Sequence, residues 1–193
     1  MSENAPNSPP AVKSPSMFLR LAIIFVGVIA ALAGYIAMQP SDFRVERSIT
    51  MAAPPEQPFA QVNDFHHWDA WSPWIKLDPN AQTSFEGAES GTGAVFKWAG
   101  NADAGVGAMT ITDSRPSELV RIRLDFEKPF KDTSTAEFRF EPAGEQTKVT
   151  WSMFGKHTFV SKAMCLMMNM DQMIGGKFEE GLASMKRVVE AKP

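Results

Sequence analysis

Residues 168–186 read MNMDQMIGGKFEEGLASMK, and this stretch decides the fold. Apolar residues in and around it recur at intervals of three and four, at Met167, Met170, Ile174, Phe178, Leu182, Met185 and Val189. This spacing places one apolar stripe along an amphipathic helix. Asn169, followed three residues later by Gln172, is typical of a capping box, so we expect the main helix to begin there. The stripe needs an apolar surface to pack on, which the rest of the chain must supply.

Three glycines lie within this helix, although each lowers helix stability by about 1 kcal/mol relative to alanine. Gly175 and Gly176 are adjacent, and Gly181 lies beside the stripe. We expect them where the helix approaches another element closely or leaves room for a bound molecule. Residues 158–168 are predicted to form a separate, looser lead-in to the helix.

The surface for the stripe is predicted from residues 81–154, where apolar and polar residues alternate as in β-strands. One face carries Val120, Ile122, Leu124 and Phe126, then Ala136, Phe138 and Phe140, then Val149, Trp151 and Met153. Strands with one dry face and one wet face are typical of an antiparallel sheet with a single buried side. Turn residues separate the strands at Glu86-Gly87, Gly100-Asn101 and Pro142–Gly144.

Two further elements precede this region. Alternation from Phe43 to Met51 predicts a first strand. A short helix is predicted over residues 55–65, because prolines are tolerated in a first helical turn and apolar residues follow at helical spacing. The predicted order is therefore strand, short helix, a run of strands, and one long helix.

Three of the five tryptophans, Trp68, Trp71 and Trp74, lie within residues 65–79, which read FHHWDAWSPWIKLDP. Ser72-Pro73 interrupts the segment, so we expect a loop or short helical turns. Large amphipathic rings gathered there favour a lid that closes one end of a hydrophobic cavity. The alternative is that all three rings plug the end of a filled core, since aromatic side chains are usually buried.

The first forty residues differ from the rest. Residues 1–16 are rich in Pro, Ser, Asn and Ala, which predicts a disordered tail. Residues 21–38 carry no charge and, as a helix, span about 27 Å, close to the hydrocarbon core of a bilayer. We therefore predict a transmembrane helix, acting as a signal anchor, over residues 17–40. Lys13 and Arg20 precede it, so the positive-inside rule favours a cytoplasmic N-terminus and a domain on the extracytoplasmic (periplasmic or extracellular) side.

A cleaved secretory signal is the alternative interpretation of this segment. Ala31-Leu32-Ala33 before Gly34 resembles a small-residue cleavage site. Twenty residues before the apolar run is long for a signal, which favours the uncleaved anchor. No cysteine follows the segment closely enough for a lipoprotein anchor, and both interpretations export the domain.

Beyond the anchor about 150 residues remain, the usual size of one domain, so residues 41–193 are assigned to a single domain. The net charge of -3, with both signs interspersed, leaves no basic stripe for nucleic acid. Cys165 is the only cysteine, which excludes an intrachain disulfide and a thiolate metal cluster. His66 and His67 are adjacent and His157 is distant, so neither a metal site nor a cofactor is predicted.

From Phe43 to Lys186 the chain resembles the START-related polyketide cyclase/dehydrase-like proteins, often labelled SRPBCC. The resemblance rests on VERSITMAAPPEQPF at residues 45–59, WDAWSPWIKLDP at 68–79, GTGAVFKWAGN at 91–101, and the C-terminal stretch quoted above. It implies an α+β helix-grip fold, in which a curved antiparallel sheet wraps around the long C-terminal helix with a hydrophobic pocket between them. It implies little about chemistry, because the superfamily includes lipid carriers, sensors and cyclases.

A pocket in this fold would be lined by apolar residues of the lid, the dry sheet face and the last helix. The candidate ligand-binding residues are Trp71, Trp74, Phe96, Trp98, Met109, Phe126, Phe138, Trp151, Met153, Met170, Ile174 and Phe178. Methionines at 164, 167, 168, 170 and 173 suit a surface that adapts to varied apolar ligands, or else fill an irregular core. Asp171 is a weak candidate for an acid/base group, with a first-turn acid favoured by the helix dipole as the alternative.

The leading hypothesis is a membrane-anchored domain that binds a small hydrophobic or lipid-like ligand, and a binding protein is favoured over an enzyme. A cyclase, dehydrase or hydrolase in the same cavity is the second hypothesis, and it would require a polar group inside. The third is a protein-interaction module with a filled pocket, whose partner binds the outer sheet face near Arg121, Arg123 and Arg139.

Overall fold

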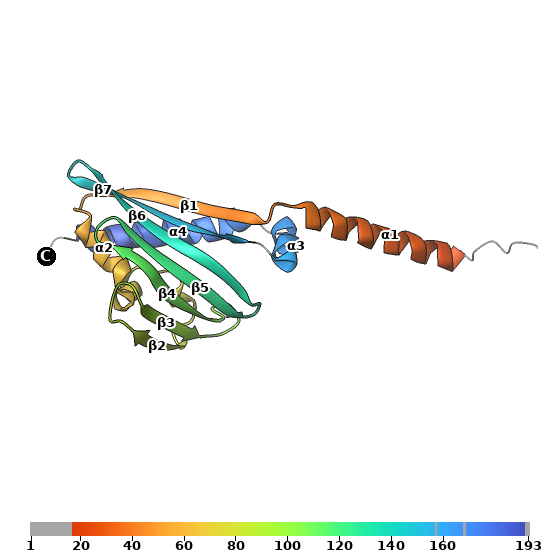
Figure 1. The fold of residues 1–193 in the computed structure, drawn as a ribbon, viewed down its shortest axis with the longest axis horizontal. Coiled ribbons are helices and arrows are strands. Elements are labelled where there is room, and N and C mark those ends of the chain that lie inside the picture. Colours follow the sequence, from red (N-terminus) through yellow and green to blue (C-terminus); the bar gives the residue numbers. More distant parts are fainter. Residues whose placement is uncertain (1–16, 157, 168, 192–193) are drawn as a thin grey trace, which may run out of the picture. The chain divides into compact units, whose positions relative to one another are not determined.

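The computed structural model describes residues 17–156, 158–167 and 169–191, which Figure 1 shows as a ribbon. Its elements in chain order are α1 (Met17–Met38), β1 (Asp42–Met51), α2 (Glu56–Asn63), the 3₁₀-helices η1 (Phe65–Ala70) and η2 (Ile75–Leu77), β2 (Gln82–Gly87), β3 (Ala94–Ala99), β4 (Val106–Arg115), β5 (Leu119–Lys128), β6 (Asp132–Ala143), β7 (Gln146–Lys156), α3 (Phe159–Met167) and α4 (Met170–Glu190). The chain divides into two units, of which the first holds α1 and the second begins at Pro40.

The helix α1 has 22 residues and is long and apolar enough to cross a membrane. Nearly all of its side chains are exposed, as expected of an apolar helix that does not belong to a protein core. A helix of this length and composition near an N-terminus is either a membrane anchor or a signal sequence.

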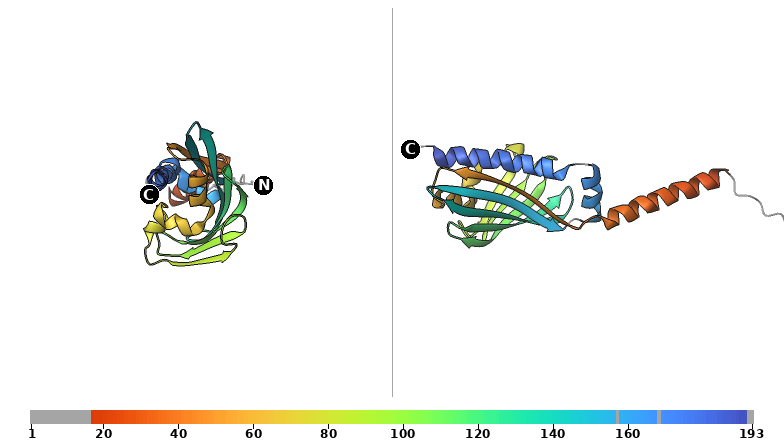
Figure 2. Two further views of the ribbon diagram at one scale, coloured as in Figure 1. Left: turned by 90° about the vertical axis from the view of Figure 1, so that its left-hand side faces the viewer. Right: turned by 90° about the horizontal axis from the view of Figure 1, so that it is seen from above.

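The second unit is built on one antiparallel sheet of seven strands in the order β1-β7-β6-β5-β4-β3-β2. Consecutive strands from β2 to β7 are neighbours, and β1 joins the sheet beside β7. The sheet curves, and α4 runs along its concave side, as the two views of Figure 2 show. This arrangement confirms the predicted α+β helix-grip fold.

The start of α4 agrees with the capping pattern in the sequence. The side chain of Asn169 accepts a hydrogen bond from the backbone N–H of Gln172 at 3.1 Å, which satisfies one of the free amides of the first turn. The apolar stripe turns towards the sheet, with Ile174, Phe178, Leu182 and Met185 all buried. The lead-in is a separate helix, α3, as predicted.

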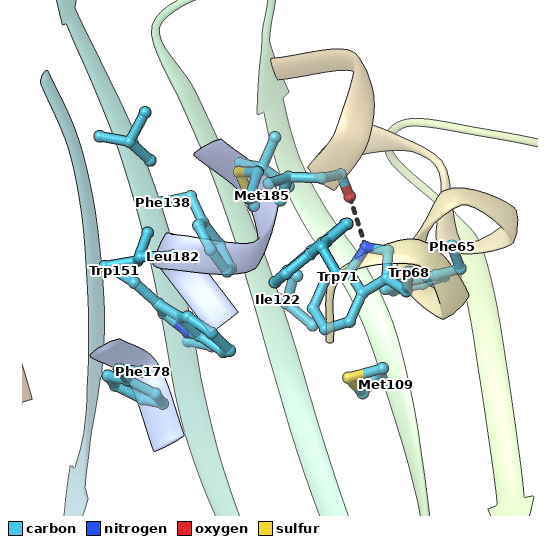
Figure 3. Packing of buried hydrophobic residues seen from close by; sticks show 14 of the residues in the cluster. Phe65, Trp68, Trp71, Met109, Ile122, Phe138, Trp151, Phe178, Leu182 and Met185 are labelled. Carbon is cyan, nitrogen blue, oxygen red and sulfur yellow. Dashed lines mark hydrogen bonds between the residues drawn. The ribbon is translucent and has the colours of Figure 1, made fainter. Parts of the chain in front are cut away.

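The core lies between the concave face of the sheet and α4, and α2 with η1 closes one end of it (Figure 3). Val62 of α2, Phe65 and Trp68 of η1, and Trp71 just after η1 are almost fully buried there. The hydroxyl of Thr147 at the start of β7 donates to the carbonyl oxygen of Ala53 at 2.7 Å and ties the connection between β1 and α2 to the sheet. Buried side chains of α2 and the tryptophan segment therefore fill the core at the α2 end.

Candidate functional site

A cavity of about 640 Å³ lies between the sheet and α4. Its walls come from β2 to β7, from Ile174 and Phe178 of α4, and from the segment that runs through η1 and η2. Aromatic and aliphatic side chains make up most of the lining.

An aromatic stack of Phe138, Trp151 and Phe178 joins the core to the cavity wall, because all three rings belong to the core and the last two also line the cavity. Figure 3 shows the three rings. Trp151 of β7 lies between Phe178, with ring centroids 4.1 Å apart and planes 13° apart, and Phe138, at 4.8 Å and 28°. Trp68 and Trp71 meet the same indole edge-on, at 6.5 and 5.7 Å. Such offset and edge-to-face contacts add about 0.5–1.5 kcal/mol per pair beyond burial and hold the stack rigid.

The tryptophan segment is held by its own indole N–H groups. Trp68 donates to the carbonyl oxygen of Val62 and Trp71 to that of Gln61, each at 3.1 Å. Both acceptors lie in α2, so the 3₁₀-turn of η1 is fastened to the helix before it. Trp68 and Trp74 both line the cavity, but only Trp74 of the three tryptophans in this segment is exposed, at 37%. One tryptophan of the three therefore faces the entrance.

The opposite end of the cavity is bounded by loops. The carboxylate of Asp78 accepts the backbone N–H of Asn101 at 2.8 Å and thereby joins the η2 segment to the β3–β4 turn. Gly105, in that turn, has a φ of +68°, and a side chain there would collide with the carbonyl oxygen of Lys128. This close approach brings the β3–β4 turn against the end of β5, and exposed residues of both segments line the cavity.

The polar groups of the lining fall into two kinds. The charged side chains are Asp69, Lys76, Asp78, Asp103 and Lys128, and all except the half-buried Asp78 are exposed. Deeper inside, Ser72 Oγ and Trp151 Nε1 are buried with no hydrogen-bond partner among the described residues. Ionisable groups thus lie at the rim, and the interior offers apolar surface with two residues that carry an unpartnered polar atom.

Nine of the twelve candidate ligand-binding residues line this cavity. They are Trp74, Phe96, Trp98, Met109, Phe126, Trp151, Met153, Ile174 and Phe178. Trp71 and Phe138 are fully buried in the packed core and do not line the cavity. The side chain of Met170, like those of Met164 and Met167, and all of Met168 and His157 lie outside the described residues.

Other lining residues were not among the candidates. Leu124 and Ala136 share the dry strand faces with Phe126 and Phe138, so the alternation of the sequence already marked them. The remainder come from η1, η2, the connecting loops and the strands β2 and β5, and no spacing pattern indicates them: Asp69, Ser72, Ile75, Lys76, Leu77, Asp78, Pro79, Ala81, Asp103, Ala104, Gly105, Lys128 and Pro129, together with Trp68 and Thr83.

Asp171 does not line the cavity. Its carboxylate is 63% exposed and receives the guanidinium of Arg47 from β1, with Nη2 to Oδ2 at 2.9 Å. Hydrogen bonding to Arg47 lowers the pKa of Asp171 below its ordinary value. An ionised, paired carboxylate on the outside of α4 fastens the helix to β1 and is not placed to exchange protons with a molecule in the cavity.

The two described histidines have local partners. Nδ1 of His66 lies 2.7 Å from Oδ1 of Asp64, and its ring stacks on Phe85 with centroids 4.0 Å apart. Nδ1 of His67 lies 3.0 Å from the carbonyl oxygen of Ala60. Among the described residues no group of three His, Cys, Asp or Glu side chains is placed to hold a metal ion.

The arginines of the outer sheet face are paired with acids. Glu137 is buried between Arg121, at 2.7 Å, and Arg139, at 2.8 Å, while Arg123 pairs with Asp125 at 2.7 Å. Burial by itself would raise the pKa of Glu137, but the hydrogen bond from Arg121 and the charge of Arg139 outweigh it and lower the pKa. Each of these three arginines is therefore in an ion pair, and two of them share the carboxylate of Glu137.

Comparison with known proteins agrees with this architecture. Residues 42–190 match the family described as polyketide cyclase / dehydrase and lipid transport. No curated protein matches the chain. Similar solved structures include the Aha1 dimer from Colwellia psychrerythraea, at 16% identity and a TM-score of 0.55 over 77% of this chain and 97% of that one.

Two further solved structures are similar at the level of the fold. Protein CV1439 from Chromobacterium violaceum has 15% identity and a TM-score of 0.52, over 79% of this chain and 100% of that one. CalU16 from Micromonospora echinospora has 14% identity and a TM-score of 0.50, over 80% and 87%. At such identities the structures show a shared fold only, whereas the family match spans nearly the whole second unit. The chain therefore belongs to the polyketide cyclase/dehydrase and lipid-transport family of the START-related SRPBCC superfamily.

Proposed function

We propose that this chain is a membrane-anchored binding protein that holds a small hydrophobic or lipid-like molecule in the cavity between the sheet and α4. The cavity carries the proposal. Its volume of about 640 Å³ lies within the range of roughly 300–1,000 Å³ that is usual for small-molecule sites. Its lining is mainly aromatic and aliphatic, which suits a ligand that leaves water by the hydrophobic effect.

The distribution of charge favours binding over catalysis. The charged side chains among the described lining residues are those named above at the rim of the cavity. Asp171, the acid/base candidate from the sequence, does not line the cavity. General acid/base chemistry needs an ionisable group within hydrogen-bond reach of the reacting atoms. A ligand deep among Phe96, Trp151 and Phe178 would meet mostly apolar surface, so we assign the cavity to carriage or sensing.

The apolar helix α1 supports the anchoring part of the proposal. We take residues 17–40 as an uncleaved anchor, with the N-terminus in the cytoplasm because Lys13 and Arg20 precede the apolar run. The domain of residues 41–193 then lies outside the cytoplasm. There it stays beside a bilayer, into which apolar ligands partition.

The proposal is tested by purifying the full chain from its own host in mild detergent and identifying what organic extraction releases. Ala136, buried on β6, lines the cavity, so Ala136→Phe fills part of it. Met153→Trp does the same from β7. Ala108→Phe is the matched control, because Ala108 alternates with the inward Met109 and faces away from the cavity.

We expect an apolar molecule in stoichiometric amount with the wild type and with Ala108→Phe, and several-fold less with the two cavity variants. Circular dichroism melts of each variant separate a filled cavity from an unfolded domain. A wild-type chain that releases only the bulk lipid mixture, unchanged by either cavity variant, overturns the proposal.

A further inference from the structure

One end of the sheet carries both the link to α1 and the far end of the cavity. Asp42, the first residue of β1, pairs with Lys156, the last of β7. Through β6 the same end continues to the β5–β6 turn, because Ser134 pairs with Gly155. It then reaches the β3–β4 turn, because Val106 pairs with Lys128. We call this end of the sheet the mouth end, since both turns contribute exposed residues to the cavity lining.

Apolar side chains protrude at the mouth end. Phe130, in the β5–β6 turn, is 57% exposed. The helix α3 follows β7 at the same end, opposite the end that α2 closes (Figure 1). Phe159 and Leu166 of α3 are 52% and 44% exposed, and seven residues apart they lie on one side of that helix. Exposed large apolar side chains at one end of a domain favour an interaction surface there.

The short linker between α1 and β1 limits how far the start of β1 can lie from a membrane that α1 spans. Only Gln39, Pro40 and Ser41 separate α1 from β1. Fully extended, the step from Met38 to Asp42 covers at most about 14 Å. If α1 spans a bilayer, Asp42 at the corner of the mouth end is therefore held within that distance of the end of α1, in whatever direction the linker runs.

The charges at the mouth end are mixed. Lys128, Lys131 and Lys156 lie there, but so do Asp42, Asp103 and Asp132. Attraction to anionic lipid is thus not the main source of affinity, whereas aromatic and aliphatic side chains suit the apolar boundary beneath the headgroups. The occupant that fits is a lipid bilayer of either charge.

We infer that the mouth end docks on the bilayer, with Phe130 and the exposed side of α3 inserted at its surface, so that the cavity opens onto lipid. The inference rests on the anchoring part of the proposed function. It adds a defined lipid-contacting surface and a route by which a ligand enters the cavity without crossing water.

The test uses the full chain in phosphatidylcholine vesicles that contain brominated lipid, which quenches a fluorophore only at close range. In a Cys165→Ser background, single cysteines carry the label at Lys131→Cys and Leu166→Cys of the mouth end. Ile29→Cys within α1 reports on the anchor, and Glu145→Cys in the β6–β7 turn reports on the opposite end of the sheet. We expect quenching at residues 29, 131 and 166 and none at 145.

The outcomes separate the docking from the anchor. Quenching at residue 29 without quenching at 131 and 166 overturns the docking and leaves the anchor standing. No quenching at residue 29 overturns the anchor, and with it the docking. A further pair of variants tests the side chains: Phe130→Ser with Phe159→Ser should reduce quenching at residue 166 several-fold. Phe85→Ser, an exposed phenylalanine of β2, should leave it unchanged, and equal effects of the two changes also overturn the inference.

Discussion

The guanidinium of Arg47 on β1 holds both carboxylate oxygens of Asp171 on α4, at 2.9 Å for Nη2 to Oδ2 and 3.2 Å for Nη1 to Oδ1. Its Nε also donates to Glu179 at 2.7 Å. The guanidinium lies directly over Gly175, so that a Cβ at this position would overlap it. Gly175 is therefore the place where α4 makes room for a side chain of the sheet. Gly176, next to it, has nothing within 4 Å of its Cβ position.

The adjacent glycines predict opposite results on substitution. Gly176→Ala should raise the free energy of unfolding by about 0.5–1 kcal/mol, because alanine stabilises a helix interior and meets no obstacle. Gly175→Ala should gain less or lose stability, because the guanidinium of Arg47 must leave Asp171 and Glu179. Thermal unfolding of the full chain, followed by circular dichroism, measures both changes.

Arg47→Met provides the control, since it keeps the apolar stem and removes the guanidinium. In that background the two glycine substitutions should have nearly the same effect. If Gly175→Ala still has a lower free energy of unfolding than Gly176→Ala in the Arg47→Met background, the cause is something other than the contact with Arg47.

A substitution of Gly181, which lies on the other side of α4, should lower the stability of the domain. A Cβ there would stand 2.8 Å from Cζ3 of Trp151 and 3.0 Å from Cδ of Pro73. Trp151 is stacked between Phe138 and Phe178, so a shift of its ring would disturb both contacts. Gly181→Ala should therefore cost about 1–3 kcal/mol through overpacking, in spite of the better helix propensity. A melting temperature as high as that of Gly176→Ala would refute the close contact.

The sequence predicted the fold closely because the fold depends on local patterns. Asn169 and Gln172 located the start of α4, and strict alternation located β5, β6 and β7. The cavity was harder, because alternation shows which face is dry but not whether that face is filled. Trp71 and Phe138 have the same pattern as their neighbours, yet they pack in the core, since α2 and η1 meet the sheet at their level. The position along the strands at which α2 and η1 meet the sheet depends on the curvature of the sheet, which no local spacing in the sequence encodes.

Arg47 illustrates a second limit. The alternation of β1 predicts that Arg47 lies on the same side of the strand as Phe43 and Val45, and the burial pattern of β1 confirms this. Its partners Asp171 and Glu179 are more than 120 residues away in the chain. Only the three-dimensional pairing of β1 with α4 explains why an arginine and a glycine occur at these two positions.

The buried carboxylate of Glu137 predicts a dependence of stability on pH. Its side chain is 3% exposed and its pKa is lowered in the folded protein. A lowered pKa means that the folded state favours the ionised form, so the stabilisation is present above the unfolded value of about 4.5 and is lost as the pH falls below it. Melts between neutral and acidic pH should show this loss, and Glu137→Gln should flatten it.

Glu141→Gln is the matched control for this experiment. Glu141 lies on the same strand, but its side chain is 58% exposed and its contact with Lys148 is longer, at 3.4 Å. An exposed pair of this kind adds little to stability. Equal flattening of the pH profile by the two variants would show that burial between the arginines has no special effect.

Two buried hydroxyls predict opposite responses to removal. Ser72 and Thr147 are both fully buried, but Thr147 donates to Ala53, whereas Ser72 Oγ has no partner among the described residues. Thr147→Val should cost about 1 kcal/mol, because a made hydrogen bond is lost and the carbonyl of Ala53 stays buried. Ser72→Ala should leave stability unchanged or raise it, because the folded protein no longer holds an unpaired polar group away from water.

Melts of ligand-stripped protein test this contrast. If Ser72→Ala destabilises as much as Thr147→Val, the hydroxyl of Ser72 has a partner in solution, and a molecule retained in the cavity is the first to examine, by extracting the sample again after the melt.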